Sequence, residues 1–274
     1  MSETLDQKLA ALKLGRMRQV YASWIEQAMH SELGYAEFLE QLVSEELLAC
    51  QEHHLRRKMK AAVFPYPATI EQFDFALRPE LKRAVLMRFF DSSFITTAGS
   101  LLLIGPSGLG KTHLAVALGT KMVQLGYTVR FVVAQRLANA VVTATTRTEL
   151  TRLIAPLISC DLLILDEFGY LTVEPQVGPV LYEIVAERYE KGATVITSNK
   201  SLATWGELVG DTALMMAIID RLLHHGEVFY LRASSYRMRG KEPVALTSRE
   251  GGITTRICIG DKSVPTKWKP CTRS

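Results

Sequence analysis

The chain has 274 residues, 48% of them hydrophobic, and a formal net charge of +4, which allows one large domain and a smaller one. Because no run of 18 apolar residues occurs, we exclude a membrane-spanning helix, and the first residues lack the charged and apolar segments of a secretory signal. The 4 cysteines are dispersed without a C-x-x-C pair, so we expect a cytoplasmic protein with free thiols and neither a disulfide nor a zinc framework.

The N-terminal part of the chain is predicted to form a small all-α module. Apolar residues recur at helical spacing over residues 3–30 and again from Phe38 to Leu48. The second pattern continues into a basic cluster at 56–60 and ends at Phe64-Pro65-Tyr66-Pro67, because proline removes a main-chain donor and restricts the residue before it. We interpret residues 1–68 as a module for contact with a partner or with DNA, although a charged helix end is the simpler explanation of the basic cluster.

Beyond this module, short apolar runs alternate with helical patterns. Continuous apolar strands separated by helices are typical of a parallel sheet that is buried on both faces. We therefore predict an α/β domain over residues 69–243. Its strands are expected at 101–105, 128–133, 162–166, 194–198 and 228–231, with helices between them.

The C-terminal residues carry the basic excess of the chain. Residues 232–274 contain 10 Lys and Arg against 3 Asp and Glu. This balance suits an anionic partner such as nucleic acid, and a solvated tail is the simpler explanation. Because residues 244–274 are polar and show no sustained period, we expect a basic, poorly ordered tail there.

A phosphate-binding sequence follows the first predicted strand and precedes a helical pattern. It matches G-x-x-x-x-G-K-[ST], whose glycines let main-chain N–H groups surround phosphate oxygens, and the following helix adds its positive dipole end. Lys111 would reach the β- and γ-phosphates of ATP, and the Thr112 hydroxyl would ligate Mg²⁺. The residues predicted to bind ATP are Gly105, Pro106, Ser107, Gly108, Leu109, Gly110, Lys111 and Thr112.

Polar residues at the ends of two later strands supply the rest of an ATPase site. Asp166 and Glu167 follow the apolar run 162–165, at the end of the strand where α/β sheets bind ligands. Asp166 would hold Mg²⁺, directly or through water, and Glu167 would orient and polarise the attacking water. Asn199 ends the fourth predicted strand, and its carboxamide can position the same water; a turn residue at a strand end is the alternative.

Two arginines are candidates for stabilising charge on the γ-phosphate. Arg221 lies on a predicted amphipathic helix and can reach the site of a neighbouring subunit, as arginine fingers do. The alternative is a salt bridge to Asp220 or another nearby acid. Arg237, in Ser235-Tyr236-Arg237, is a second candidate cation that would act within its own subunit.

In order and spacing, these motifs resemble those of the AAA+ helicase-loader group, and they are most similar to the IstB-like proteins, the ATPase helpers of insertion-sequence transposition. The phrases that carry the likeness are Asp166-Glu167-Phe168-Gly169-Tyr170-Leu171, Asp220-Arg221-Leu222-Leu223-His224-His225 and Ser235-Tyr236-Arg237. The resemblance covers roughly residues 1–243. It departs in the chain beyond Ser235-Tyr236-Arg237, because the family usually ends soon after this phrase.

The resemblance implies an AAA+ P-loop NTPase with strand order 5-1-4-3-2 and Mg²⁺-dependent ATP hydrolysis. It also implies self-association into a ring or spiral on duplex DNA, and recruitment or stimulation of a partner transposase that acts on a target site. By position, Asn199 matches sensor 1, Arg221 the arginine finger and Arg237 the sensor-2 region. A replicative helicase loader of the DnaC type shares this core and is the nearest alternative.

DNA contacts are expected on the insertion between the second and third strands. Arg147 and Arg152 lie there and could meet phosphates, as could Lys200, which would give weakly sequence-selective binding with a steep salt dependence. Ordinary surface charge is the alternative for each. A small-molecule kinase is a further alternative, but the sequence shows neither an Arg-rich lid nor an acceptor pocket. A scaffold with a degenerate ATP site is disfavoured by the intact set of catalytic residues.

Overall fold

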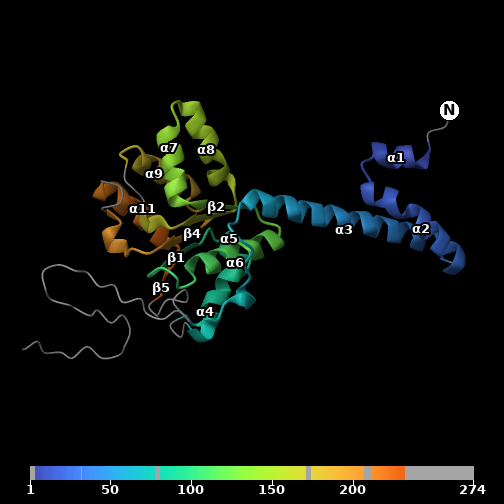
Figure 1. Ribbon diagram of the computed structural model, residues 1–274, viewed down its shortest axis with the longest axis horizontal. Coiled ribbons are helices and arrows are strands. Elements are labelled where there is room, and N and C mark those ends of the chain that lie inside the picture. Colours follow the sequence, from blue (N-terminus) through green and yellow to red (C-terminus); the bar gives the residue numbers. More distant parts are fainter. Residues whose placement is uncertain (1–3, 32, 78–80, 171–173, 207–210, 232–274) are drawn as a thin grey trace, which may run out of the picture.

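The computed structural model describes residues 4–31, 33–77, 81–170, 174–206 and 211–231 (Figure 1). Arg237 and the predicted tail at 244–274 lie outside the described residues. Within the described ranges, no helix is both long enough and apolar enough to cross a membrane.

The N-terminal residues form α1 (Leu5–Ala11), α2 (Gly15–Ser31) and α3 (Tyr35–Ala62). Figure 1 shows α3 extending away from the rest of the molecule, with α2 alongside its far end. The continuous helical pattern expected over residues 3–30 is wrong in one respect, because the chain breaks between α1 and α2. Lys13 adopts a left-handed φ of 60° at the break, and an L-residue with a side chain in that conformation cannot continue a right-handed helix.

The end of α3 is anchored on the α/β domain. Ala62 is fully buried in the core, and the ring of Phe64 meets Phe131 of the second strand at a centroid distance of 6.3 Å. The Lys58 ammonium donates to the Gly126 carbonyl, and the Arg130 guanidinium donates to the Ala61 carbonyl. These contacts join the helical module firmly to the domain that follows.

The predicted α/β class with a five-stranded parallel sheet is confirmed. All pairings are parallel, and the strands lie side by side in the order β2-β3-β4-β1-β5, which read from β5 is 5-1-4-3-2. The strands are β1 (Ser100–Ile104), β2 (Val129–Val133), β3 (Leu162–Asp166), β4 (Ala193–Ser198) and β5 (Gly226–Tyr230).

Successive strand residues enter two different hydrophobic cores, because side chains alternate between the faces of a sheet. Leu101 and Leu103 pack with the helices on one face, whereas Leu102 and Ile104 pack with those on the other. The first face is covered by the end of α3, α4 (Arg83–Met87), α5 (Ser93–Thr96) and α6 (Lys111–Gln124). The second face is covered by α7 (Ala134–Thr143), α8 (Arg147–Ser159), α9 (Val177–Arg188) and α11 (Thr212–His224).

A buried arginine ties the second helical layer to the amino-terminal edge of the sheet. Arg188 is only 2% exposed, and its guanidinium donates to the main-chain oxygens of Leu157 (2.8 Å), Cys160 (2.7 Å) and Ala193. Burial lowers the pKa of Arg188 below its ordinary value. This one side chain therefore donates to buried carbonyls at the end of α8 and at the start of β4.

Candidate nucleotide-binding site

The predicted phosphate-binding loop, Asp166, Glu167 and Asn199 lie at the carboxyl edge of the sheet. β1 and β3 both pair with β4, and Ile104 at the end of β1 lies opposite Ser198 at the end of β4. The segments that leave these three strands must therefore meet. In open α/β sheets this edge is where ligands bind.

Gly105, Gly108 and Gly110 of the phosphate-binding loop all have a positive φ, and at two of them the neighbours leave no room for a Cβ. Gly105 has a φ of 152°, and a Cβ built there would lie 2.3 Å from the carbonyl oxygen of Leu231. Gly110 has a φ of 88°, and a Cβ there would lie 2.7 Å from the ring of Phe73. Leu231 therefore packs against the start of the loop and Phe73 against its end. The Gly105 N–H also donates to the Ser198 carbonyl at 3.0 Å, which fixes the loop to β4.

Lys111 opens α6 and turns its ammonium back onto the loop. The residue is 9% exposed, and its Nζ donates to the carbonyls of Gly105 at 2.6 Å and Pro106 at 2.8 Å. A buried cation therefore lies at the amino end of a 14-residue helix. An anion enclosed by this loop would meet both that charge and the helix dipole.

Asp166 and Thr112 form a pair of oxygen donors. The Thr112 hydroxyl contacts both carboxylate oxygens of Asp166, at 2.9 and 3.2 Å, and Asp166 is only 4% exposed. Neighbouring ligands of an octahedral Mg²⁺ with bonds of about 2.0–2.1 Å lie about 2.9 Å apart. Hard oxygen donors at this separation fit Mg²⁺.

Glu167 leaves the strand in an unusual conformation. Its φ is 58°, in the left-handed region that disfavours residues with a side chain by about 1–2 kcal/mol. Its main-chain N–H donates to the Thr197 hydroxyl at 3.0 Å, and its side chain is exposed although β3 is buried throughout. A non-glycine residue held this way at a sheet edge is typical of a functional site.

Asn199 lies against the turn that follows Glu167. Its Oδ1 is buried and is one of two such side-chain atoms in the described residues without a hydrogen-bond partner. A Cβ added to Gly169 would lie 2.0 Å from this oxygen, so only glycine permits the approach. The indole N–H of Trp205 donates to the Ser198 hydroxyl at 3.2 Å, and its ring packs on Phe168 with the ring centroids 4.5 Å apart.

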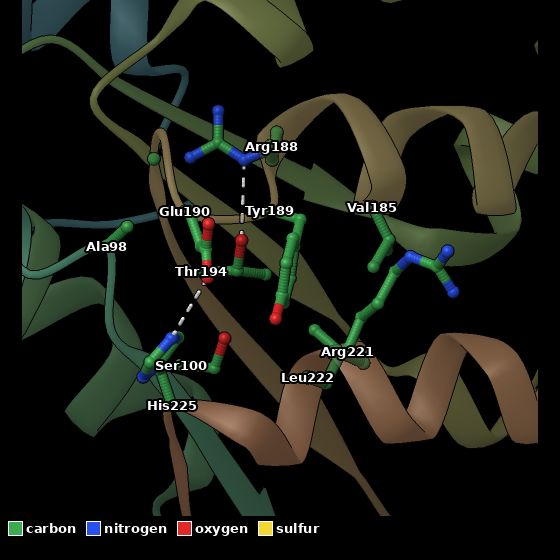
Figure 2. Close-up of a pocket in the computed structure, with 11 residues that line it drawn as sticks. Ala98, Ser100, Val185, Arg188, Tyr189, Glu190, Thr194, Arg221, Leu222 and His225 are labelled. Carbon is green, nitrogen blue, oxygen red and sulfur yellow. Dashed lines mark hydrogen bonds and ion pairs between the residues drawn. The ribbon is translucent and has the colours of Figure 1, made fainter.

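Arg221 lies at the opposite edge of the sheet (Figure 2). Its guanidinium donates to the Tyr182 hydroxyl at 2.9 Å and stacks over that ring at 4.8 Å. It lines a pocket together with Ser100, the first residue of β1. The phosphate-binding loop follows the other end of that strand, so Arg221 begins at the edge of the sheet opposite to its own loop. Its guanidinium extends one turn back along α11, where it donates to the Ala217 carbonyl at 3.0 Å. Within the described residues no ion pair joins it to Asp220.

The candidate DNA contacts are on the surface, two of them on α8. Arg147 begins α8 and pairs with Glu183 of α9 at 3.4 Å. Arg152 is exposed further along α8, and Lys200 is exposed beside Asn199. Arg147, Arg152 and Lys200 as DNA contacts therefore stay predictions.

Sequence reasoning missed several residues that hold the site. Thr197 joins Asp166 to Glu167, Phe73 covers the loop at Gly110, and Gly169 meets Asn199. Thr197 is one of three hydroxyl residues of β4, with Thr194 and Ser198, so the sequence held no signal that singled it out. The roles of Phe73 and Gly169 come from contacts between distant segments, which residue spacing does not reveal.

Comparison with known proteins gives the same assignment over most of the chain. The family described as "IstB-like ATP binding protein" matches residues 7–243. The chain is 36% identical over 252 residues to "Insertion sequence IS21 putative ATP-binding protein" of Pseudomonas aeruginosa, covering 92% of each chain. It is 35% identical over 241 residues to "Insertion sequence IS5376 putative ATP-binding protein" of Geobacillus stearothermophilus, covering 88% of this chain and 96% of the relative.

Solved structures of AAA+ proteins share the fold at low sequence identity. DnaI superposes with a TM-score of 0.52 and 18% identity, over 60% of this chain and 91% of its own. AMPPCP-bound DnaA from Aquifex aeolicus superposes with a TM-score of 0.53 and 20% identity, over 62% of this chain and 51% of its own.

Proposed function

This chain belongs to the IstB-like ATP-binding protein family, and we propose that it is a Mg²⁺-dependent ATPase that assembles on duplex DNA and recruits or stimulates a partner transposase. The observation that carries the ATPase proposal is one hydrogen-bonded chain. It runs from Thr112 through Asp166 and Thr197 to the main chain of Glu167. This chain links the start of the phosphate-binding helix to the two carboxylates that hydrolysis requires.

Each residue of the site has a definite task in this proposal. The loop and Lys111 bind the β- and γ-phosphates, and Thr112 and Asp166 would hold Mg²⁺, which neutralises phosphate charge when bound. The exposed Glu167 carboxylate accepts a proton from the attacking water and orients it. Asn199 follows β4 at the same edge of the sheet, and its carboxamide is the proposed second contact to that water.

The position of Arg221 supports action on a neighbouring subunit. Within its own chain it lies at the amino-terminal edge of the sheet, whereas the loop lies at the carboxyl edge. A head-to-tail assembly brings such opposite edges together and forms a ring or spiral. The guanidinium would then meet the γ-phosphate of the next subunit and stabilise the charge that develops there.

DNA binding is proposed through phosphate contacts rather than through base reading. Arg147, Arg152 and Lys200 are the predicted contacts, and the family's association with insertion sequences makes a transposase the expected partner. Binding of this kind weakens steeply as salt rises, because counterions are released from DNA. Fluorescence titration of labelled duplex at two salt concentrations tests it, and equal affinity at both contradicts it.

The decisive experiment measures ATP hydrolysis and sedimentation together, with and without duplex DNA. The wild type should hydrolyse ATP faster with DNA and sediment as an assembly. Lys111→Ala should lose ATP binding, whereas Glu167→Gln should bind ATP, hydrolyse it slowly and stay assembled on DNA. Wild-type turnover by Glu167→Gln would contradict the assignment of the catalytic carboxylate.

The DnaC-type helicase loader is the alternative, and the partner bound by residues 1–68 distinguishes the two. Full-length protein with ATP and DNA should retain a transposase from the same insertion sequence in a pull-down. Retention of a replicative helicase instead would favour the loader. Omission of ATP serves as the control for either result.

A further inference from the structure

Three metal-binding side chains converge at the end of α11, away from the nucleotide site. Glu190, His224 and His225 each present one ligand atom, and these atoms all lie within 4.8 Å of one another. His225 Nε2 and Glu190 Oε1 are 3.6 Å apart (Figure 2). None of the three has a role in the proposed ATPase chemistry.

Backbone geometry explains why two adjacent histidines can point at one place. His224 is the last residue of α11, and His225 follows it with φ −119° and ψ 32°, outside the helix. Their ring centroids are 4.3 Å apart. His53 and His54 are adjacent too, but they lie inside α3, where neighbouring side chains diverge around the helix.

The third ligand comes from the turn after α9. Glu190 has a left-handed φ of 59°, so the chain reverses just beyond the helix and brings this carboxylate towards α11. α9 and α11 pack against each other. The cluster therefore lies where the ends of two packed helices meet.

Tyr189 supports the cluster through a contact with His224. Its hydroxyl lies 2.8 Å from Nδ1 of His224. This contact orients the imidazole and leaves Nε2 of His224 for a ligand. Metal-bound histidines usually have such a partner on the other ring nitrogen.

We propose that Glu190, His224 and His225 bind a divalent transition-metal ion of the zinc class. Two imidazoles and one carboxylate are a donor set that Zn²⁺ takes in proteins, with a fourth position left for water. Zn²⁺ bonds of about 2.0–2.2 Å separate tetrahedral ligands by about 3.4 Å. The His225–Glu190 separation of 3.6 Å is close to this value, and because all three side chains are exposed, small rotations can close the remaining gap.

Nearby positive charge does not oppose the ion directly. Arg188 and Arg221 line the same pocket (Figure 2), but Arg188 is bonded to buried carbonyls and Arg221 to Tyr182. The ion would join the turn after α9 to the end of α11. Arg221 belongs to α11 and bonds to Tyr182 of α9, so the ion would link the two helices that position this arginine. The proposal does not depend on the ATPase function.

The test is a metal titration of the full-length protein after treatment with EDTA, in the absence of nucleotide. Calorimetry with Zn²⁺ and visible absorption with Co²⁺, which reports tetrahedral coordination, are run on the wild type and on His224→Ala/His225→Ala. The matched control is His53→Ala/His54→Ala, which removes an equal number of exposed imidazoles. Comparison of the two double variants separates loss of this site from a general loss of exposed imidazoles.

The proposal expects one Zn²⁺ site per chain that His224→Ala/His225→Ala loses and His53→Ala/His54→Ala keeps. Tyr189→Phe should weaken the site about 10-fold, as loss of an outer partner does. Zn²⁺ should raise the thermal midpoint of the wild type but not that of His224→Ala/His225→Ala. Since the side chains are exposed, all variants should have the same midpoint without metal. Equal isotherms for the wild type and His224→Ala/His225→Ala would overturn the proposal.

Discussion

The Thr197 hydroxyl donates a 2.5 Å hydrogen bond to Oδ1 of Asp166 and accepts a 3.0 Å bond from the main-chain N–H of Glu167. One side chain on β4 thus fixes both carboxylates at the end of β3. Thr197→Val keeps the shape of the side chain but removes both bonds. We expect it to lower kcat for ATP hydrolysis by on the order of 100-fold, because a displacement of about 1 Å at a reacting group has that effect.

Thr197→Ser separates positioning from packing. Serine keeps the hydroxyl and loses only a methyl group, so most of the activity should return. ATP affinity should change little in either variant, because the phosphate-binding loop is not altered. Steady-state kinetics and nucleotide binding measure the two effects, and full kcat in Thr197→Val would show that the hydroxyl has no positioning role.

Gly169 approaches Asn199 more closely than any other residue type could. A Cβ at position 169 would lie 2.0 Å from Asn199 Oδ1 and 3.1 Å from the main-chain N of Lys200. Gly169→Ala must therefore push this segment away from the site, and such overpacking costs about 1–3 kcal/mol. We expect normal ATP binding with impaired hydrolysis.

Gly15→Ala is the matched control for this change. A Cβ at Gly15 meets nothing within 4 Å, and the residue begins α2, far from the nucleotide site in Figure 1. Stability and hydrolysis should both be unchanged or slightly improved. If Gly169→Ala hydrolyses ATP as Gly15→Ala does, the position of Asn199 is not important for the reaction.

The sequence alone predicts that several candidate site residues lie together, because each stands at the end of an apolar strand. The phosphate-binding loop, Asp166, Glu167 and Asn199 all follow strands with strong apolar runs, and parallel topology brings strand ends to one edge. The break at Lys13 was not predictable, because the helical spacing of apolar residues continues across it although Lys13 itself has a left-handed φ. The Tyr182 contact of Arg221 and the anchoring of Arg188 depend on how helices pack, which periodicity does not determine.

Arg188 gives a prediction about stability rather than activity. Arg188→Met fills similar space but removes the hydrogen bonds of the guanidinium to the carbonyls of Leu157, Cys160 and Ala193. A hydrogen bond to a charged group contributes about 1.5–3 kcal/mol, so the free energy of unfolding should fall by about 3 kcal/mol or more. Denaturant titration measures it. Arg136→Met changes an exposed arginine on α7 and should have almost no effect; equal losses in the two variants would contradict the structural role of Arg188.

The place of Arg221, which begins at the edge of the sheet opposite to its own phosphate-binding loop, makes a prediction about mixed assemblies. Arg221→Ala and Glu167→Gln should each be nearly inactive alone. When the two are mixed with DNA, an intact Glu167 in one subunit can meet an intact Arg221 from its neighbour, so part of the activity should return. Mixing Arg221→Ala with Glu167→Gln/Arg221→Ala supplies no intact guanidinium and should restore nothing. ATP hydrolysis across a range of mixing ratios measures this, and an absence of recovery in the first mixture would place the function of Arg221 within its own subunit.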